Sequence, residues 1–145
     1  REIDWLSEAI PLLEICAEKI NAWDKLEALL EPYWQKCASS YITKVKMLAR
    51  KGDTELAIET LNKQLDNHPT MRGFESLLSL YQQVLPDNRT QQSLEQMQTL
   101  IVKQIKQRPK YRCHSCGFSG RQLYWLCPSC KKWSVIKPIK GLDGE

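Results

Sequence analysis

The residues with the clearest chemistry in this sequence are four cysteines toward its C-terminal end. They form two Cys-x-x-Cys pairs, Cys113 with Cys116 and Cys127 with Cys130, and ten residues separate the pairs. A turn of this spacing lets both thiolates face one point, and two such turns supply the four soft ligands of a tetrahedral zinc or iron site. We therefore predict that all four sulfurs bind a single metal ion.

Other interpretations of these cysteines are a disulfide pair, a redox motif or four unconnected thiols. A redox dithiol needs a single Cys-x-x-Cys motif, whereas Gly117 after one pair and Pro128 inside the other favour two matched metal-binding turns. Zn2+ is the favoured ion and rubredoxin-type iron is the alternative, because four sulfurs in a tetrahedron accept both. The short linker between the pairs favours a structural role over electron transfer, and we expect His114 to be solvated rather than a fifth ligand.

The segment that carries the cysteines is too short to fold by apolar burial alone. It runs from about Lys110 to Lys140, and a chain of that length normally needs a metal or disulfides. A structural zinc site contributes roughly 10 to 16 kcal/mol of apparent folding free energy. We expect nearby aromatic residues to cover the metal and dock the module, and nearby cations to offset the charge of the thiolates. The aromatic residues are Tyr111, Phe118, Tyr124, Trp125 and Trp133, and the cations are Arg112, Arg121, Lys131 and Lys132.

The rest of the chain predicts helices in pairs. Apolar residues recur every three or four positions over 74–85 and again over 94–105, which is the period of an amphipathic helix. Earlier pairs are expected over 4–20 with 22–37, and over 41–50 with 53–67. The pairs repeat at roughly 31 to 36 residues, as in helical solenoids.

Glycine, proline and capping residues set the expected ends of these helices. Gly52 is expected to end one helix and Asp53 to cap the next, while Thr70 is expected to cap the helix after it. The Pro86-Asp87-Asn88 segment should separate the last two helices, and Pro109 should stop the final one. Pro11 should lie in the first turn of its helix, and Pro32 should kink or end the helix that contains it.

These patterns predict two domains. Residues 1–109 should form an all-α, tetratricopeptide-like repeat scaffold, and residues 110–145 a small rubredoxin-like or zinc-ribbon module with its tail. The run from Gly52 through Ala57 to Pro69 matches the second half of a tetratricopeptide repeat in part. Because each repeat packs against its neighbours, the start at Arg1 suggests that further repeats precede it.

Composition places the chain among ordinary globular proteins. Of its 145 residues, 42% are hydrophobic and 26% charged. The sequence contains no run of about eighteen apolar residues, which is the length that a membrane-spanning helix needs. Four cysteines in a metal pattern favour a reducing compartment. From residue 103 onward, ten Lys and Arg face two acidic residues. Such a basic segment can contact nucleic acid, anionic lipid or an acidic protein.

No constellation of residues suggests an enzyme. The sequence has two histidines, His68 and His114, and neither has a plausible nucleophile and third partner near it in the sequence. We therefore predict no catalytic residues, no organic cofactor site and no small-molecule substrate. A protein-interaction scaffold is the favoured function, and a nucleic-acid-binding zinc ribbon is the less favoured alternative.

Several segments resemble a known bacterial family, that of lipopolysaccharide assembly protein B. The resemblance covers about residue 50 to the end well and the earlier part less closely. It depends on the runs Leu61-Asn62-Lys63-Gln64-Leu65, His68-Pro69-Thr70-Met71-Arg72, Pro109-Lys110-Tyr111-Arg112-Cys113 and Leu123-Tyr124-Trp125, and on the tail from Trp133 to Gly144. Of these, the tail is the most specific.

The resemblance implies more than spacing can. It implies a non-enzymatic adaptor with cytoplasmic repeats, a rubredoxin-like metal domain held against them, and an N-terminal anchor in the bacterial inner membrane that this sequence does not contain. It also implies that the protein restrains lipopolysaccharide synthesis by promoting degradation of the deacetylase LpxC by the membrane protease FtsH, beside other lipopolysaccharide assembly proteins. The metal ligands of the family correspond to Cys113, Cys116, Cys127 and Cys130.

Overall fold

The computed structural model describes residues 5–84 and 88–145. The predicted break at Pro86-Asp87 and the predicted helix start at Asp4 lie outside this range. Within the described residues the chain forms six α-helices, one 3-10 turn and three short strands. In order these are α1 (Leu6–Lys19), α2 (Trp23–Leu30), η2 (Glu31–Tyr33), α3 (Ala38–Arg50), α4 (Thr54–Asn67), α5 (Met71–Val84), α6 (Asn88–Gln107), β1 (Tyr111–Cys113), β2 (Ser119–Gly120) and β3 (Ile136–Pro138).

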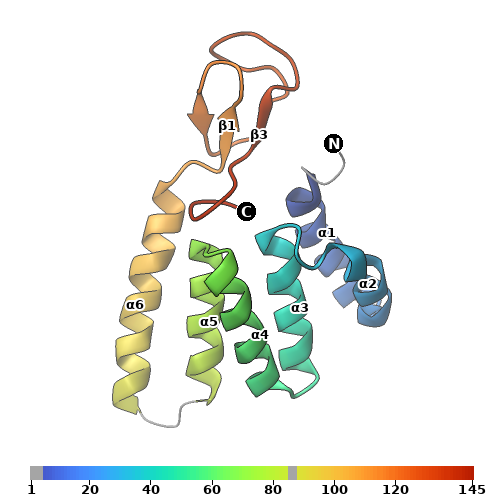
Figure 1. The fold of residues 1–145 in the computed structure, drawn as a ribbon, viewed down its shortest axis with the longest axis vertical. Coiled ribbons are helices and arrows are strands. Elements are labelled where there is room, and N and C mark those ends of the chain that lie inside the picture. Colours follow the sequence, from blue (N-terminus) through green and yellow to red (C-terminus); the bar gives the residue numbers. More distant parts are fainter. Residues whose placement is uncertain (1–4, 85–87) are drawn as a thin grey trace.

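The helices pack in chain order, each against its neighbours. Helix α3 packs on α4, α4 on α5 and α5 on α6, and α1 lies against α2 and α3. Figure 1 shows α3 to α6 side by side, with the strands of the C-terminal module beyond the ends of these helices. The predicted fold class is confirmed: a helical scaffold is followed by a small C-terminal module with a zinc-ribbon-like arrangement of four cysteines.

Among the described residues, the helical part has one buried cluster between α1, α2 and α3 and a larger one between α3, α4 and α5. Ala57 and Leu61 of α4 are fully buried there, beside Tyr41 and Val45 of α3. Gly73 of α5 lets the helices approach closely, because a Cβ at this position would lie 2.5 Å from Leu65 Cδ2. The alternation of large apolar residues with Ala and Gly in the sequence therefore sets how tightly these helices pack.

Some of the predicted helix ends are confirmed. Gly52 has the positive φ expected of a residue that ends a helix, +94°. Thr70 caps α5 as predicted, because the Gly73 amide donates to Thr70 Oγ1 at 3.1 Å. Pro32 lies in the turn η2 that follows α2, so α2 ends at Leu30 as the proline requires.

Other helix predictions were wrong. Pro11 lies in the second turn of α1 rather than the first, so this helix continues through a position without an amide donor. Asp53 occupies the N-cap position of α4, yet its side chain makes no capping hydrogen bond. Helix α3 begins at Ala38 rather than Tyr41, and the Cys37 amide donates to Ser40 Oγ at 3.4 Å across its first turn, as in a capping box.

The C-terminal module is a three-stranded antiparallel sheet. Strand β1 is central, with the order β2-β1-β3, and Tyr111 lies opposite Gly120 on one side and Pro138 on the other. After β3 the chain turns back toward the helices, where the Met71 amide donates to Leu142 O at 2.9 Å. The module therefore meets the helical part through both the end of α6 and its own returning tail (Figure 1).

Candidate metal centre

The first Cys-x-x-Cys turn begins at the end of strand β1. Cys113 is fixed there because its amide donates to Phe118 O at 2.7 Å, and the Gly117 amide returns to Cys113 O at 3.0 Å. Gly117 has φ +78°, which glycine adopts without steric cost. The amides of Ser115 and Cys116 each donate to Cys113 Sγ at 3.4 Å, which holds this sulfur in place within the turn.

The second turn repeats the first. The Lys131 amide donates to Cys127 O and the Cys127 amide donates to Lys132 O, both at 3.0 Å. Lys131 holds the position that Gly117 holds in the first turn, and it also has a positive φ, +58°. A lysine in this conformation is less favourable than a glycine. The pairing of Leu126 with Trp133 closes the hairpin around this turn.

The two turns bring the four predicted ligands together. All four sulfur atoms lie within 4.8 Å of one another. Cys113 Sγ is 3.8 Å from Cys130 Sγ, and Cys116 Sγ is 3.7 Å from Cys127 Sγ, so each close pair joins the two turns. A tetrahedral ion with metal–sulfur bonds near 2.3 Å separates its sulfurs by about 3.8 Å. The observed spacing therefore fits one metal ion at the centre.

The same distances argue against the disulfide interpretation. All four cysteines are free thiols in the structure, and separations of 3.7 and 3.8 Å exceed the S–S bond length of about 2.05 Å. Four protein ligands would complete the tetrahedron around an ion and would leave no coordination position for a substrate or an attacking water. A closed site of this kind is typical of structural zinc rather than of hydrolytic zinc.

Two of the thiols, one from each turn, have different electrostatic environments. A hydrogen bond from the backbone at Phe118 lowers the pKa of Cys116 to about 6. Burial raises the pKa of Cys127 to about 11, against the opposing effect of backbone hydrogen bonds from Cys130 and Ser129. Cys127 would thus stay protonated at neutral pH without a cation, whereas a bound divalent ion deprotonates a coordinating thiol outright. The site therefore suits a divalent cation, whose positive charge would stabilise the thiolate form of Cys127.

The cations predicted to surround the cluster are divided between two places. Lys132 links the two turns, because its Nζ donates to Ser115 Oγ at 2.9 Å. Arg112 is exposed on strand β1. Arg121, in contrast, lines a pocket shared with helices α1 and α6. The sequence alone did not distinguish the cations beside the sulfurs from the one that faces the helices.

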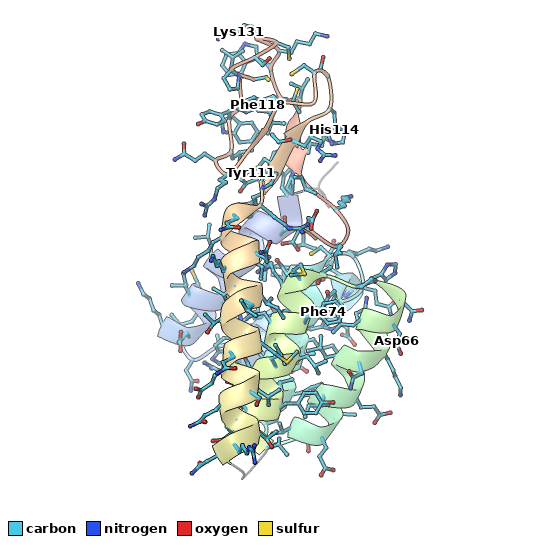
Figure 2. The ribbon with its side chains drawn as sticks, turned by 90° about the vertical axis from the view of Figure 1, so that its left-hand side faces the viewer. Asp66, Phe74, Tyr111, His114, Phe118 and Lys131 are labelled. Carbon is cyan, nitrogen blue, oxygen red and sulfur yellow. The ribbon has the colours of Figure 1, made fainter. Side chains whose placement is uncertain are left out.

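The aromatic residues also divide. Tyr111 is buried, and Phe118 packs with the buried cluster of Tyr111, Cys113, Cys127 and Ile136. Trp125 contacts Trp5 of the helical part, with 5.2 Å between ring centroids. The prediction that Trp133 covers the metal or docks the module was wrong, because this side chain is 70% exposed. In Figure 2, Tyr111 lies where the module meets the helices and Phe118 lies further into the module. His114 lies at one side of the module, and Lys131 lies at the end that is far from the helices. His114 is exposed, as expected of a solvated residue.

The returning tail also contacts the helices, and sequence reasoning missed this contact. The Glu145 carboxylate accepts from the Ser39 amide and from Ser39 Oγ, both at 2.9 Å, and it pairs with Arg72. Ser39 lies in the first turn of α3, where a carboxylate also meets the positive end of the helix dipole. The specific sequence of the tail was a usable signal, but it did not say which side chains it contacts.

Comparison with known proteins adds an independent finding. Residues 111–138 match a family model described as the rubredoxin metal binding domain. Over 96% of its length the chain is 31% identical to lipopolysaccharide assembly protein B of Escherichia coli strain K12. Over 97% of its length it is 29% identical to the protein of that name from Haemophilus influenzae. The chain spans 36% of the length of each of these relatives. The resemblance inferred from the sequence is confirmed.

Proposed function

We propose that this chain is the part of a lipopolysaccharide assembly protein that binds other proteins, with a metal module that holds its last helices in a fixed arrangement. Relatives that match nearly the whole chain carry the name lipopolysaccharide assembly protein B. The single structural observation that supports the proposal is the sulfur cluster joined through a short sheet and a returning tail to α3 and α5. We infer a non-enzymatic role from the closed metal site.

We further propose that residues 110–145 are the metal-binding domain and residues 1–109 a tetratricopeptide-like scaffold. Cys113, Cys116, Cys127 and Cys130 would hold one ion, Zn2+ or iron. When bound, that ion supplies the cross-link that the small sheet cannot obtain from apolar burial. The chain's own contribution is to present four sulfurs at tetrahedral spacing and to tie their module to the helices.

The partners are the finer part of the proposal. We propose that the full-length protein acts at the cytoplasmic face of the bacterial inner membrane and brings the deacetylase LpxC to the FtsH protease, beside other lipopolysaccharide assembly proteins. Among residues 5–84 and 88–145, no helix has both the length and the apolar character needed to cross a bilayer.

The proposal is tested by affinity purification of the full-length protein from membranes. The Cys127→Ser variant loses one ligand of the cluster, and we expect it to recover much less protease and deacetylase than the unchanged protein does. Cys16→Ser is the matched control, because Cys16 is an exposed cysteine of α1 that lies outside the cluster. Equal recovery of both partners with Cys127→Ser and Cys16→Ser would contradict the role of the metal module.

One observation supports nucleic-acid binding as a second candidate. Trp133 is 70% exposed and lies close in sequence to Lys131 and Lys132, and exposed aromatic residues beside cations can stack on bases. This function predicts oligonucleotide affinity that falls steeply with salt. Titration with single-stranded and duplex DNA at low salt, in parallel for the protein and Trp133→Ala, tests it. Absence of any binding by the unchanged protein would remove this candidate.

A further inference from the structure

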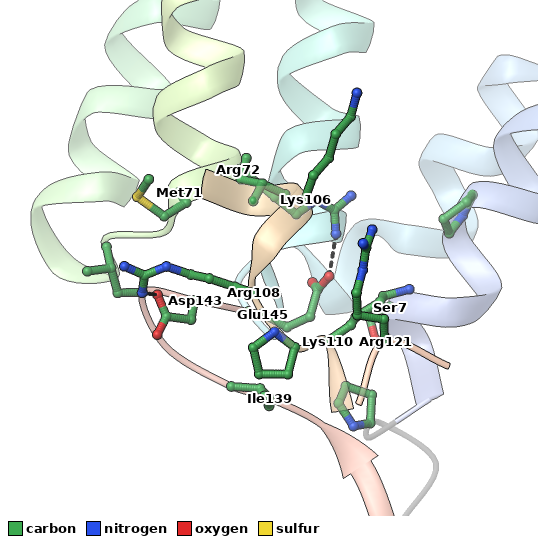
Figure 3. Close-up of a pocket in the computed structure, with 16 residues that line it drawn as sticks. Ser7, Met71, Arg72, Lys106, Arg108, Lys110, Arg121, Ile139, Asp143 and Glu145 are labelled. Atoms are coloured by element: carbon green, nitrogen blue, oxygen red, sulfur yellow. Dashed lines mark hydrogen bonds and ion pairs between the residues drawn. The ribbon is translucent and has the colours of Figure 1, made fainter. Parts of the chain in front are cut away.

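A pocket of about 290 Å³ lies where the metal module meets helices α1, α5 and α6. Figure 3 shows it enclosed by the ends of these helices and the returning tail. Its walls come from distant parts of the sequence, so it exists only when the module is docked. Apolar parts of the wall are formed by Pro11, Met71, Ile105, Pro109, Ile139 and Leu142.

Positive charge predominates in the lining of this pocket. Five cationic side chains line it, together with two carboxylates, those of Asp143 and Glu145. Both carboxylates are already paired, Glu145 with Arg72 and Asp143 with Arg108. A third cation, Lys110, pairs at 2.8 Å with Glu8. The acidic groups at the pocket are therefore engaged with cations of the protein itself.

Two cations of the lining are left without an acidic partner. Across residues 5–84 and 88–145, the side chains of Lys106 and Arg121 make no ion pair within 4.0 Å and no hydrogen bond. Lys106 belongs to the last turn of α6, and Arg121 directly follows strand β2. The two charges thus come from the two parts of the molecule that the pocket separates.

The surroundings strengthen the attraction of these charges for an anion. Apolar walls focus an electric field that open solvent would screen. The first turn of α5, with Met71 and Arg72, also lies at the pocket and brings the positive end of a helix dipole. The end of α6 brings a negative dipole end to the same place. That end carries only about half an elementary charge, so it does not cancel the charge of Lys106.

We propose that this pocket binds a small organic phosphate monoester. Two uncompensated cations match a dianion, and a phosphate monoester carries roughly −1.5 to −2 charges at neutral pH. The volume lies at the lower end of the range for small-molecule sites, which favours a ligand of this size over a peptide. The phosphate would lie between Lys106 and Arg121, and its organic part against Ile105, Pro109 and Ile139. Such a ligand would connect α6 to the module and stabilise their docking.

The experiment is calorimetric titration of the metal-loaded chain with phenyl phosphate, beside its isosteric monoanion phenyl sulfate. We expect saturable binding of phenyl phosphate and clearly weaker binding of phenyl sulfate. Lys106→Gln and Arg121→Gln should each weaken phenyl phosphate binding by about tenfold, because each removes a charge-assisted hydrogen bond. Unchanged far-UV circular dichroism and cobalt–thiolate absorption would show that both variants fold.

Lys103→Gln is the matched control. Lys103 lies on α6 less than one turn before Lys106 and has the same charge. It lines a neighbouring surface hollow, which Lys106 and Arg121 also line, but it does not line this pocket. Lys103→Gln therefore separates binding in the pocket from binding in the hollow. Its affinity for phenyl phosphate should change less than about twofold, as a distant screened charge would give. No binding to the unchanged protein, or equal weakening by Lys103→Gln and Lys106→Gln, would overturn the proposal.

The same phosphate chemistry occurs in soluble metabolites and in lipid headgroups. Sedimentation with phosphatidylcholine vesicles containing phosphatidic acid distinguishes these sources. Co-sedimentation that is lost in both Lys106→Gln and Arg121→Gln would assign the pocket to a headgroup. Phenyl phosphate binding without co-sedimentation would assign it to a soluble phosphate. Co-sedimentation that both variants retain, without phenyl phosphate binding, would place anion binding elsewhere and refute the pocket.

Discussion

Helices α3 to α5 bury a continuous apolar cluster that includes Tyr41, Ala57 and Leu61, whereas the buried cluster of the C-terminal module consists of Tyr111, Ile136 and two of its own cysteines. The first region can be held by the removal of apolar surface from water. The second has far less of that surface and instead places four sulfurs around one point. The comparison teaches that one chain can depend on two sources of stability, apolar burial in the helices and metal binding in the module. Mutations in the two regions should therefore have separate effects.

The largest expected effect comes from removing the metal. Chelation, or Cys127→Ser, should unfold the module, because a structural site of this type contributes roughly 10 kcal/mol or more. In two-dimensional NMR spectra, the amides of residues 111–138 should lose their dispersion while those of 38–67 keep theirs. Retained dispersion over 111–138, with metal analysis showing an empty site, would contradict the comparison.

The next largest effect is expected in the helical core. Leu61 is fully buried, so Leu61→Ala should lower the free energy of unfolding of the helices by about 3 kcal/mol. Cobalt binding by the module, followed by its thiolate absorption, should stay stoichiometric. Leu56→Ala is the control on the same helix, since Leu56 is 49% exposed, and it should cost less than about 1 kcal/mol. Loss of cobalt binding in Leu61→Ala would show that the two regions are not separable in this way.

A smaller effect is expected where the two regions are joined. Glu145→Gln keeps the shape of the side chain but removes the charge that meets Ser39 and Arg72. We expect a loss of about 1 to 2 kcal/mol in helical stability, since the carboxylate is nearly buried but Arg72 is partly exposed. Urea unfolding followed at 222 nm measures it. The exposed Glu55 of α4 provides the control, Glu55→Gln, with less than about 0.5 kcal/mol expected. Equal effects would mean that the tail contact contributes nothing specific.

The smallest effect is expected from changes at the matching positive-φ positions of the two cysteine turns. Lys131 and Gly117 occupy matching positions with positive φ, so Lys131→Gly should stabilise the metal-bound form by about 0.5 to 1 kcal/mol. Gly117→Lys should act in the opposite direction, because open space surrounds a Cβ at Gly117 and the backbone conformation alone opposes it. Competition for Zn2+ with a chromogenic chelator measures both changes. A shift of the same sign in the two variants would refute the explanation.

Much of the local structure could be predicted from the sequence. Thr70 and Gly52 fixed helix ends because capping and a left-handed turn depend on neighbouring residues only. The cysteine spacing predicted each Cys-x-x-Cys turn for the same reason, since each turn is closed by hydrogen bonds within a few residues. Pro11 was harder to place, because a helix continues past a proline when packing elsewhere compensates for the missing amide bond.

The sequence by itself determined the helical periods, the ends at Thr70 and Gly52, and the two turns that hold the cysteines, because these depend on interactions over one or two turns of chain. Only the tertiary structure decided that Glu145 reaches Ser39 across more than a hundred residues, that Trp133 faces solvent, and that Lys106 and Arg121 line one pocket. These outcomes depend on how the module docks on the helices, and docking is set by the summed packing of surfaces that no local pattern encodes.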